Sequence, residues 1–116
     1  MSDHELNTAE NATVVFVNRF TLHTSPEEFE RAFDTTAQFL RRQPGFLQST
    51  LSRHADKPDS YLNIARWRDA RSFHAALTHP DFAAHAAALR AVSTSDPNLY
   101  VPRRTITAEP PDRERP

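Results

Sequence analysis

The segment Gly45–Trp67, GFLQSTLSRHADKPDSYLNIARW, decides the fold of this protein. Within it, Phe46–Arg53 and Tyr61–Trp67 carry the apolar, aromatic and β-branched residues that are typical of strands. Asp56–Asp59, which contains a proline, predicts the turn that joins them. The chain is therefore expected to have two consecutive strands near its centre, with no helix between them.

A strand and a helix are predicted before this central pair. Thr13–Leu22 is rich in β-branched and aromatic residues and predicts the first strand. Ser25–Glu28 then supplies an N-cap serine, a proline in the first turn and a glutamate three residues after the cap, which together predict a helix start. The helix is expected to end near Arg42, because Pro44–Gly45 cannot continue it.

Helical segments and a last strand follow the central pair. Asp69 is predicted to cap a short helix, and Pro80 to open a second helical piece. Leu99–Thr107 predicts the fourth strand, which Pro102 confines to an edge of the sheet. The resulting order, β-α-β-β-α-β, is the ferredoxin-like arrangement of an α+β protein. We expect its first and third strands to be parallel neighbours at the centre, and its helices to cover one face of the sheet.

Length and composition limit the protein to one domain and exclude several classes of site. The 116 residues predict a single domain over residues 13–107, with polar, disordered tails at 1–12 and 108–116. The sequence has no cysteine and only one glycine, Gly45, which excludes thiolate-bound metals, glycine-rich nucleotide turns and phosphate-binding loops. The formal charge of −1 argues against nucleic acid and an anionic membrane as partners. Because no apolar run is long enough to span a membrane, we expect a cytoplasmic protein.

The two-residue period of the central strands predicts a sheet that is apolar on both faces. The helices suffice to cover only one face, and the other face would expose more apolar surface than a soluble monomer usually tolerates. We therefore expect a homodimer, a dimeric α+β barrel that packs sheet against sheet. The side chains predicted on this outer face are Val15, Val17, Leu47, Leu51, Leu62 and Ile64.

Three polar residues interrupt the opposite, helix-covered face. Asn18 lies in Val14–Leu22, and a buried amide without partners costs roughly 1–3 kcal/mol, so a helix end or an ordered water is its ordinary partner. Asn63 and Trp67 share one face of the third strand, about 13 Å apart, with the small Ala65 between them. Two carboxamides and an indole N–H are expected to converge on one pocket. The ordinary alternative for Trp67 is a core aromatic whose N–H bonds a backbone carbonyl.

The rest of the predicted pocket is aromatic, which suits a flat polycyclic ligand. Among the six histidines only His85 is considered for proton transfer, because it lies beside an apolar helix face. No histidine spacing typical of a metal site is present, so we predict no metal. The residues predicted to contact the ligand are Phe16, Phe20, Tyr61, Ala65, Phe73, Phe82 and His85.

Three segments carry a resemblance to a known family. Pro44–Leu47 leads into a strand, and Tyr61–Trp67 is followed directly by Arg68–Phe73. On these residues the sequence resembles the antibiotic biosynthesis monooxygenase family, whose members are dimeric α+β barrels of ferredoxin-like topology. The resemblance extends over Val14–Ile106.

Within that family, Asn63 and Trp67, together with Asn18, resemble the cofactor-independent anthrone oxygenases of aromatic polyketide pathways. The resemblance implies that these three residues are catalytic, that an aromatic polyketide and molecular oxygen are the substrates, and that no cofactor is needed. Such an oxygenase would deprotonate the anthrone to an enolate, pass an electron to oxygen and form a peroxide that loses water. Water, a substrate phenolate and His85 are all open as the proton acceptor.

Two other classes of function stay open. The haem-degrading branch of the same family also begins with an Asn-Arg pair, like Asn18-Arg19 here. It needs a tryptophan and an axial histidine at the positions of Ala76 and Ala86, and His85 is one residue out of register with that ligand. The second class is a non-catalytic module that binds a polyketide. Absorption spectra with added haem distinguish a haem-degrading enzyme from a cofactor-independent oxygenase. Oxygen uptake with an anthrone in the presence of a chelator distinguishes such an oxygenase from a non-catalytic binding module.

Overall fold

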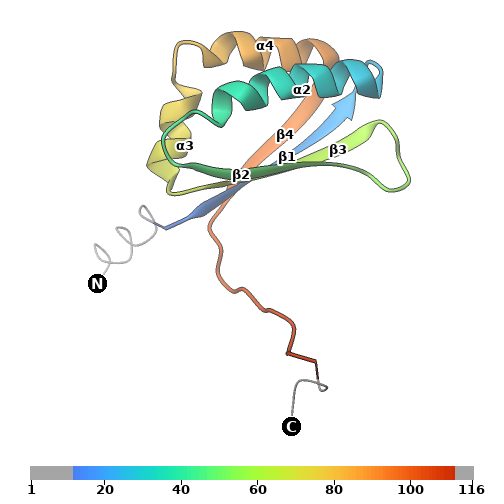
Figure 1. The fold of residues 1–116 in the computed structure, drawn as a ribbon. Helices are drawn as coiled ribbons and strands as arrows, with labels where there is room; N and C mark the ends of the chain where they lie inside the picture. Colours follow the sequence, from blue (N-terminus) through green and yellow to red (C-terminus); the bar gives the residue numbers. More distant parts are fainter. Residues whose placement is uncertain (1–11, 112–116) are drawn as a thin grey trace.

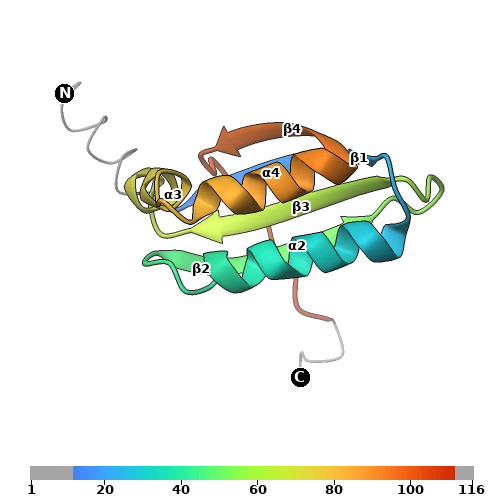
Figure 2. The ribbon, with the colours of Figure 1, turned by 90° about the horizontal axis from the view of Figure 1, so that it is seen from above.

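The structure is a computed structural model that describes residues 12–111, a four-stranded sheet covered on one face by helices (Figure 1). Its elements are β1 Val14–Leu22, α2 Pro26–Leu40, β2 Phe46–Arg53, β3 Ser60–Trp67, α3 Ala70–Leu77, α4 Phe82–Val92 and β4 Ser93–Tyr100. The helices α2 and α4 lie beside each other over the sheet, and α3 packs near the end of β3 (Figure 2). This architecture confirms the predicted ferredoxin-like α+β fold. No helix within residues 12–111 is long and apolar enough to cross a membrane.

The sheet is antiparallel throughout, with the strand order β2-β3-β1-β4. β1 and β3 are the central pair, as predicted, but the prediction that they run parallel is wrong. A short loop of residues 54–59 joins β2 to β3 and makes these two antiparallel, whereas the helical crossover through α2 makes β1 parallel to β2. β3 lies between β1 and β2, so it is antiparallel to both.

Side-chain caps fix the starts of two helices where the sequence predicts them. Ser25 Oγ accepts a hydrogen bond from the backbone N–H of Glu28 at 3.1 Å and begins α2. Asp69 accepts from the backbone N–H of Ser72 at 2.7 Å and begins α3. This hydrogen bond holds the pKa of the Asp69 carboxyl below its usual value of 3.8.

Gly45 is required by both its backbone and its surroundings. Its φ is +88°, and a Cβ built on it would lie 2.3 Å from Cβ of Ser72. Any other residue would combine a strained backbone with a clash. The Gly45 carbonyl also accepts a hydrogen bond from the backbone N–H of Arg68 at 2.7 Å. The single glycine therefore ties the start of β2 to the loop between β3 and α3.

The fourth strand is displaced from its predicted position. It runs over Ser93–Tyr100 directly after α4, so the predicted range Leu99–Thr107 is wrong. As an edge strand, β4 pairs only with β1, and this edge tolerates Pro97, which has no N–H to donate. Residues 101–111 continue without regular secondary structure on the side of the sheet away from the helices (Figure 1). The tails predicted at residues 1–11 and 112–116 lie outside the described residues.

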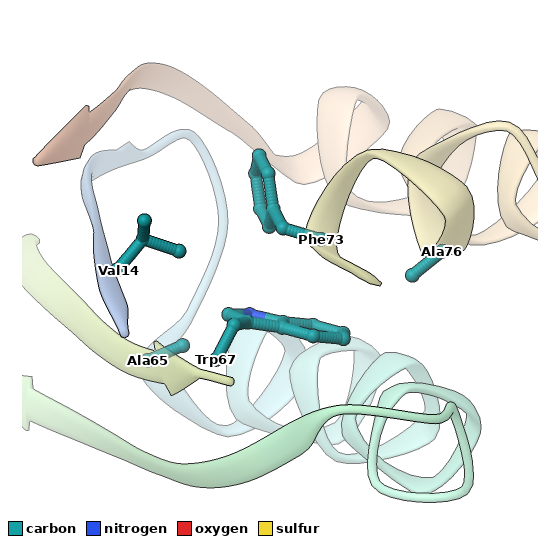
Figure 3. Close-up of a cluster of buried hydrophobic side chains, with 5 residues drawn as sticks. All are labelled: Val14, Ala65, Trp67, Phe73 and Ala76. Atoms are coloured by element: carbon teal, nitrogen blue, oxygen red, sulfur yellow. The ribbon is translucent and has the colours of Figure 1, made fainter. Parts of the chain in front are cut away.

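Two clusters of buried side chains join the helices to the sheet. The first lies where α3 meets the strands, with the Trp67 indole beside the ring of Phe73 (Figure 3). The second joins α2 to β1 and β3. The buried members of the first cluster are Val14, Ala65, Trp67, Phe73 and Ala76, and those of the second are Phe20, Leu22, Phe29, Phe33 and Tyr61.

A β-bulge changes the outer face of the sheet from the predicted one. The pairing of β2 with β3 shifts between Phe46 and Gln48, which displaces the alternation of side chains by one residue. Leu47 is 55% exposed and Ile64 is 42% exposed, in keeping with the prediction of an apolar outer face. Leu51 instead packs against the second core cluster on the helix side. Its predicted place on the outer face is therefore wrong.

Candidate active site

A cavity of about 90 Å³, here called the sheet cavity, lies between the sheet and the helices where the two core clusters meet. It adjoins a second cavity of about 240 Å³, the α4 cavity, which is bounded by α4 and β4. Taken together, they reach the lower end of the volumes of ligand pockets, roughly 300–1,000 Å³. The residues that line both cavities are Phe16, Asn18, Phe20, Leu77, Phe82 and Leu89.

Asn18 and Asn63 face each other across the central strand pair. The two residues are direct partners in the register of β1 and β3, and such partners have Cβ atoms about 4.5–5.5 Å apart. Both line the sheet cavity. The structure thus brings together two carboxamides that the sequence placed only on neighbouring strands.

The oxygen of Asn18 is held by the edge strand. Asn18 Oδ1 accepts a hydrogen bond from the backbone N–H of Asp96 at 3.1 Å. The neighbouring Pro97 lies opposite Asn18 in the register and has no N–H of its own. The expected partner was a helix end or a water, and the structure supplies a strand backbone instead. The Asn18 N–H₂ group keeps its two donors for other acceptors.

The oxygen of Asn63 is held by a side chain from β2. Ser49 Oγ donates a hydrogen bond to Asn63 Oδ1 at 2.6 Å, and Asn63 is only 5% exposed. Ser49 also lines the sheet cavity. Ser49 was not predicted as a site residue, because regular alternation in β2 would place it on the outer face with Leu47. The bulge has no signature in the sequence that would have corrected this.

Trp67 is fixed by its aromatic neighbours. It is 1% exposed, and its ring meets Phe46 edge to face at 5.2 Å and Phe73 at 5.7 Å between centroids. It is thus a core aromatic, as the ordinary alternative expected. No hydrogen bond joins its indole N–H to another residue within residues 12–111, whereas that alternative also expected a backbone carbonyl. Trp67 lines the sheet cavity with Asn18 and Asn63.

Most of the predicted aromatic wall lines the cavity. Phe16 packs on Phe73 with ring centroids 4.9 Å apart. Phe82 comes from α4 and lines both the sheet cavity and the α4 cavity. The predicted ligand contacts that do line the sheet cavity are Phe16, Phe20, Ala65, Phe73 and Phe82.

Two predicted ligand contacts lie elsewhere. The Tyr61 hydroxyl donates a hydrogen bond to Glu30 Oε2 at 2.5 Å, inside the second core cluster. Burial raises the pKa of this hydroxyl, and the Glu30 carboxylate raises it further. His85 packs against Phe39, with ring centroids 5.2 Å apart and an interplanar angle of 31°. Neither Tyr61 nor His85 is among the residues that line the two cavities.

The sheet cavity offers hydrogen-bond donors but no ionisable side chain. Its lining contains no Asp, Glu, His, Lys or Arg, and Arg90 reaches only the α4 cavity. Amide and indole N–H groups stabilise negative charge and do not titrate near neutral pH. Within residues 12–111 no group of three or more His, Asp and Glu side chains could hold a metal ion. The arrangement suits an aromatic ligand on which negative charge develops.

Fold and cavity together define a small ferredoxin-like α+β protein with a largely apolar cavity between its sheet and its helices. The chain belongs to the antibiotic biosynthesis monooxygenase family, whose model matches residues 13–88. The family that the sequence resembles is thereby confirmed.

Close relatives are known by sequence and by structure. The chain is 54% identical over 93 residues to deoxynogalonate monooxygenase of Streptomyces nogalater, covering 80% of this chain and 79% of the relative. The crystal structure of SnoaB, a cofactor-independent oxygenase from Streptomyces nogalater, aligns with a TM-score of 0.81 at 52% identity. That alignment covers 84% of this chain and 99% of SnoaB. A conserved protein from Methanosarcina mazei aligns over 84% of this chain and 99% of its own with a TM-score of 0.71, but at 14% identity it shows the fold alone.

Proposed function

We propose that the protein is a cofactor-independent oxygenase that converts a polyketide anthrone, related to deoxynogalonate, to the anthraquinone with molecular oxygen. One observation carries the proposal: two carboxamides and an indole line an apolar cavity without an ionisable side chain. The relative named deoxynogalonate monooxygenase and the cofactor-independent oxygenase SnoaB, both more than 50% identical, support it. We place this activity in the cytoplasm, as expected from the sequence.

The substrate itself can supply the electrons for this reaction. Ground-state oxygen is a triplet and does not combine in one step with a closed-shell molecule, so most oxygenases employ a metal or flavin. An anthrone that loses its benzylic proton becomes an enolate, which passes one electron to oxygen. The resulting radical and superoxide combine to a peroxide, and loss of water leaves the new carbonyl. Overall, one CH₂ group and one O₂ give one C=O group and one water.

The protein's part is to stabilise the enolate oxygen and to exclude bulk water. Asn63 and Trp67 are proposed to donate hydrogen bonds to the oxygens that flank the reactive carbon. Asn18 is proposed to position the substrate or oxygen from the facing strand. Donors fixed before the charge develops cost no reorganisation at the moment of reaction. The packing of the Trp67 ring and the anchored oxygens of both asparagines support such preorganisation.

A water molecule or a phenolate of the substrate is proposed as the proton acceptor. His85 packs against Phe39 and does not line either cavity. Direct proton transfer requires an approach of about 2.6–3.2 Å, which favours the two alternatives over His85. Replacing His85 by Gln should therefore leave turnover within a factor of two.

Oxygen consumption without a cofactor is the decisive test. Purified protein is mixed with an anthrone in the presence of a metal chelator, and oxygen uptake and quinone absorbance are followed together. We expect one oxygen consumed per quinone formed, with ¹⁸O from the gas in the product. The Asn63→Ala variant serves as the matched control for non-enzymatic oxidation. Uptake that disappears with the chelator, or equal rates for both proteins, would refute the proposal.

The haem-degrading alternative is less well supported by the site. Haem oxygenation needs an axial ligand, and no histidine lines the sheet cavity or the α4 cavity. Titration with haemin should therefore give no sharp Soret band of a histidine-ligated haem. A stoichiometric band that survives gel filtration would restore this alternative.

We also propose that the outer face of the sheet packs on a second copy of the chain. Leu47 and Ile64 are strongly exposed there, and residues 101–111 extend from the same side with Ile106 90% exposed (Figure 1). Large apolar side chains exposed on one face of a sheet favour a contact with another protein surface. Sedimentation velocity at micromolar concentration should give a dimer. A single monomer species over the whole concentration range would contradict it.

A further inference from the structure

We propose that Ser49 is a positioning residue, which holds the Asn63 carboxamide with its N–H₂ group directed at the ligand. This inference rests on the proposed function, because it concerns the same cavity. It adds a residue that was not predicted from the sequence.

The geometry fixes one end of the carboxamide. Ser49 Oγ and Asn63 Oδ1 are 2.6 Å apart, and the Asn63 side chain is almost fully buried. A carboxamide is planar and carries its oxygen and its nitrogen on opposite corners. Holding the oxygen on the β2 side therefore also fixes the direction of Nδ2. A carboxamide turned by 180° would present an acceptor to the substrate oxygen and would repel the enolate.

The β2 bulge makes this contact possible. Ser49 lies two residues beyond Leu47, where the register shifts, and pairs with Ala65 on β3. Asn63 lies two positions from Ala65 on the same face, so Ser49 meets it diagonally across the strands. Without the bulge the hydroxyl would point to the outer face, and Asn63 would lose this donor.

Asn18 and Asn63 are held in the same way: the side-chain oxygen of each accepts a hydrogen bond from the protein, but from different donors. Asn18 Oδ1 accepts from the backbone N–H of Asp96, and Asn63 Oδ1 accepts from the Ser49 hydroxyl. In both, the oxygen is engaged by the protein and the N–H₂ group is left as a donor. The backbone N–H of Asp96 cannot be removed by changing its side chain, whereas the Ser49 hydroxyl can. Ser49 is therefore the anchor that mutagenesis can test.

The test compares two isosteric substitutions, Ser49→Thr and Ser49→Val, which differ only in the hydroxyl. Ser49→Val should lower kcat about tenfold with KM within a factor of two, because the amide remains but its orientation is freed. Ser49→Thr should retain most of the wild-type kcat. Ser52→Val, on the exposed outer side of the same strand, is the control for strand substitution and should be unchanged. Equal kcat in the Thr and Val variants would overturn the proposal.

A double mutant distinguishes positioning from a structural role. In the Asn63→Ala background, Ser49→Val should cause no further loss of kcat, because the group that it positions is already gone. A second tenfold loss in that background would show that Ser49 acts independently of Asn63, against the proposal.

Side-chain amide NMR tests the contact without any turnover. The ¹⁵N-bound proton pair of Asn63 is assigned by its disappearance in Asn63→Ala. It should keep its shifts in Ser49→Thr and move or broaden in Ser49→Val. Unchanged resonances in Ser49→Val would refute the positioning role. If the wild-type protein consumed no oxygen, the proposed function would fail, whereas this measurement would still decide the role of Ser49.

Discussion

The two sides of β3 differ in their surroundings, and we propose a different task for each. Toward the helices, Asn63 and Trp67 line the sheet cavity and are almost fully buried. On the outer side, Ile64 is 42% exposed on a face that we propose to be an interface. Because side chains alternate along a strand, the residues proposed for chemistry and those proposed for assembly are separated by a single peptide unit. Substitutions at adjacent positions should therefore have separable effects.

The largest effect is expected on the cavity side, from Asn63→Ala. Loss of a donor that acts mainly in the transition state costs about 2.7–4 kcal/mol, so kcat should fall about 10²–10³-fold. Anthrone-dependent oxygen uptake measures this loss, and sedimentation velocity should show an unchanged oligomeric state. If Asn63→Ala lost both turnover and self-association, the two sides of β3 would not have separable effects.

Trp67→Phe is expected to follow with a loss of about 10²-fold, the lower end of the same range. Phenylalanine keeps an aromatic ring against Phe46 and Phe73 but has no N–H. The melting temperature reports the lost packing separately from the lost donor. If turnover were unchanged, the indole N–H would have no part in the reaction.

On the outer side, Ile64→Glu should weaken self-association with little effect on the cavity. A carboxylate in an apolar interface lacks partners and costs about 2 kcal/mol or more, which is roughly a thirtyfold rise in the dissociation constant. Sedimentation equilibrium measures this constant, with Thr35→Glu on exposed α2 as the charge-matched control. Equal association of both variants would remove the outer face from the interface.

Tyr61→Phe tests a residue that lies on the helix-covered face of β3 but does not line the sheet cavity. Loss of the hydrogen bond to Glu30 should lower the free energy of unfolding by about 1 kcal/mol, with turnover unchanged. The pKa of Tyr61 is raised in the folded state. The contribution of its protonated hydroxyl to stability is therefore complete below pH 10.0 and is lost as the pH rises through the pKa of the folded state. The alkaline loss of stability should be smaller in the variant, as measured by urea unfolding between pH 8 and 11. Tyr100→Phe, at an exposed tyrosine, is the control.

The smallest effect is expected just beyond β3, at Asp69. Its pKa is lowered in the folded state. The contribution of the ionised carboxylate to stability is therefore present above pH 3.8 and is lost as the pH falls through the pKa of the folded state. Asp69→Asn keeps a capping side chain but should show a shallower loss of melting temperature in acid. Asp81→Asn, at a helix start without a side-chain cap hydrogen bond, should match the wild type. An unaltered acid slope in Asp69→Asn would exclude this contribution.

The order of elements and most of the site follow from local rules, whereas the errors arise from register and direction. Helix caps, the Pro44–Gly45 break and the alternation of side chains in β3 depend on neighbours in sequence, and these predictions agree with the structure. The bulge in β2 is decided by pairing with β3, so the positions of Ser49 and Leu51 could not be predicted from alternation alone. The direction of β3 follows from topology, which an element order by itself does not state.

Two predicted ligand contacts, Tyr61 and His85, could not be excluded from the sequence alone. Tyr61 shares a face with Asn63 and Trp67, but the second core cluster fills the space above it. His85 was expected beside the pocket from its helical spacing, but it packs on Phe39 of α2. Sharing a face is a property of sequence, whereas sharing a cavity depends on how the helices lie on the sheet.

In the proposed reaction, the absence of ionisable groups from the lining of the sheet cavity leaves the acid–base behaviour to the substrate. The protein contributes no proton equilibrium of its own near the reacting carbon, so the midpoint of the pH–rate curve should follow the acidity of the anthrone. Two anthrones of different benzylic acidity should then give two displaced curves on the same enzyme. In this sense the protein sets where charge is stabilised, and the substrate sets the pH at which it works.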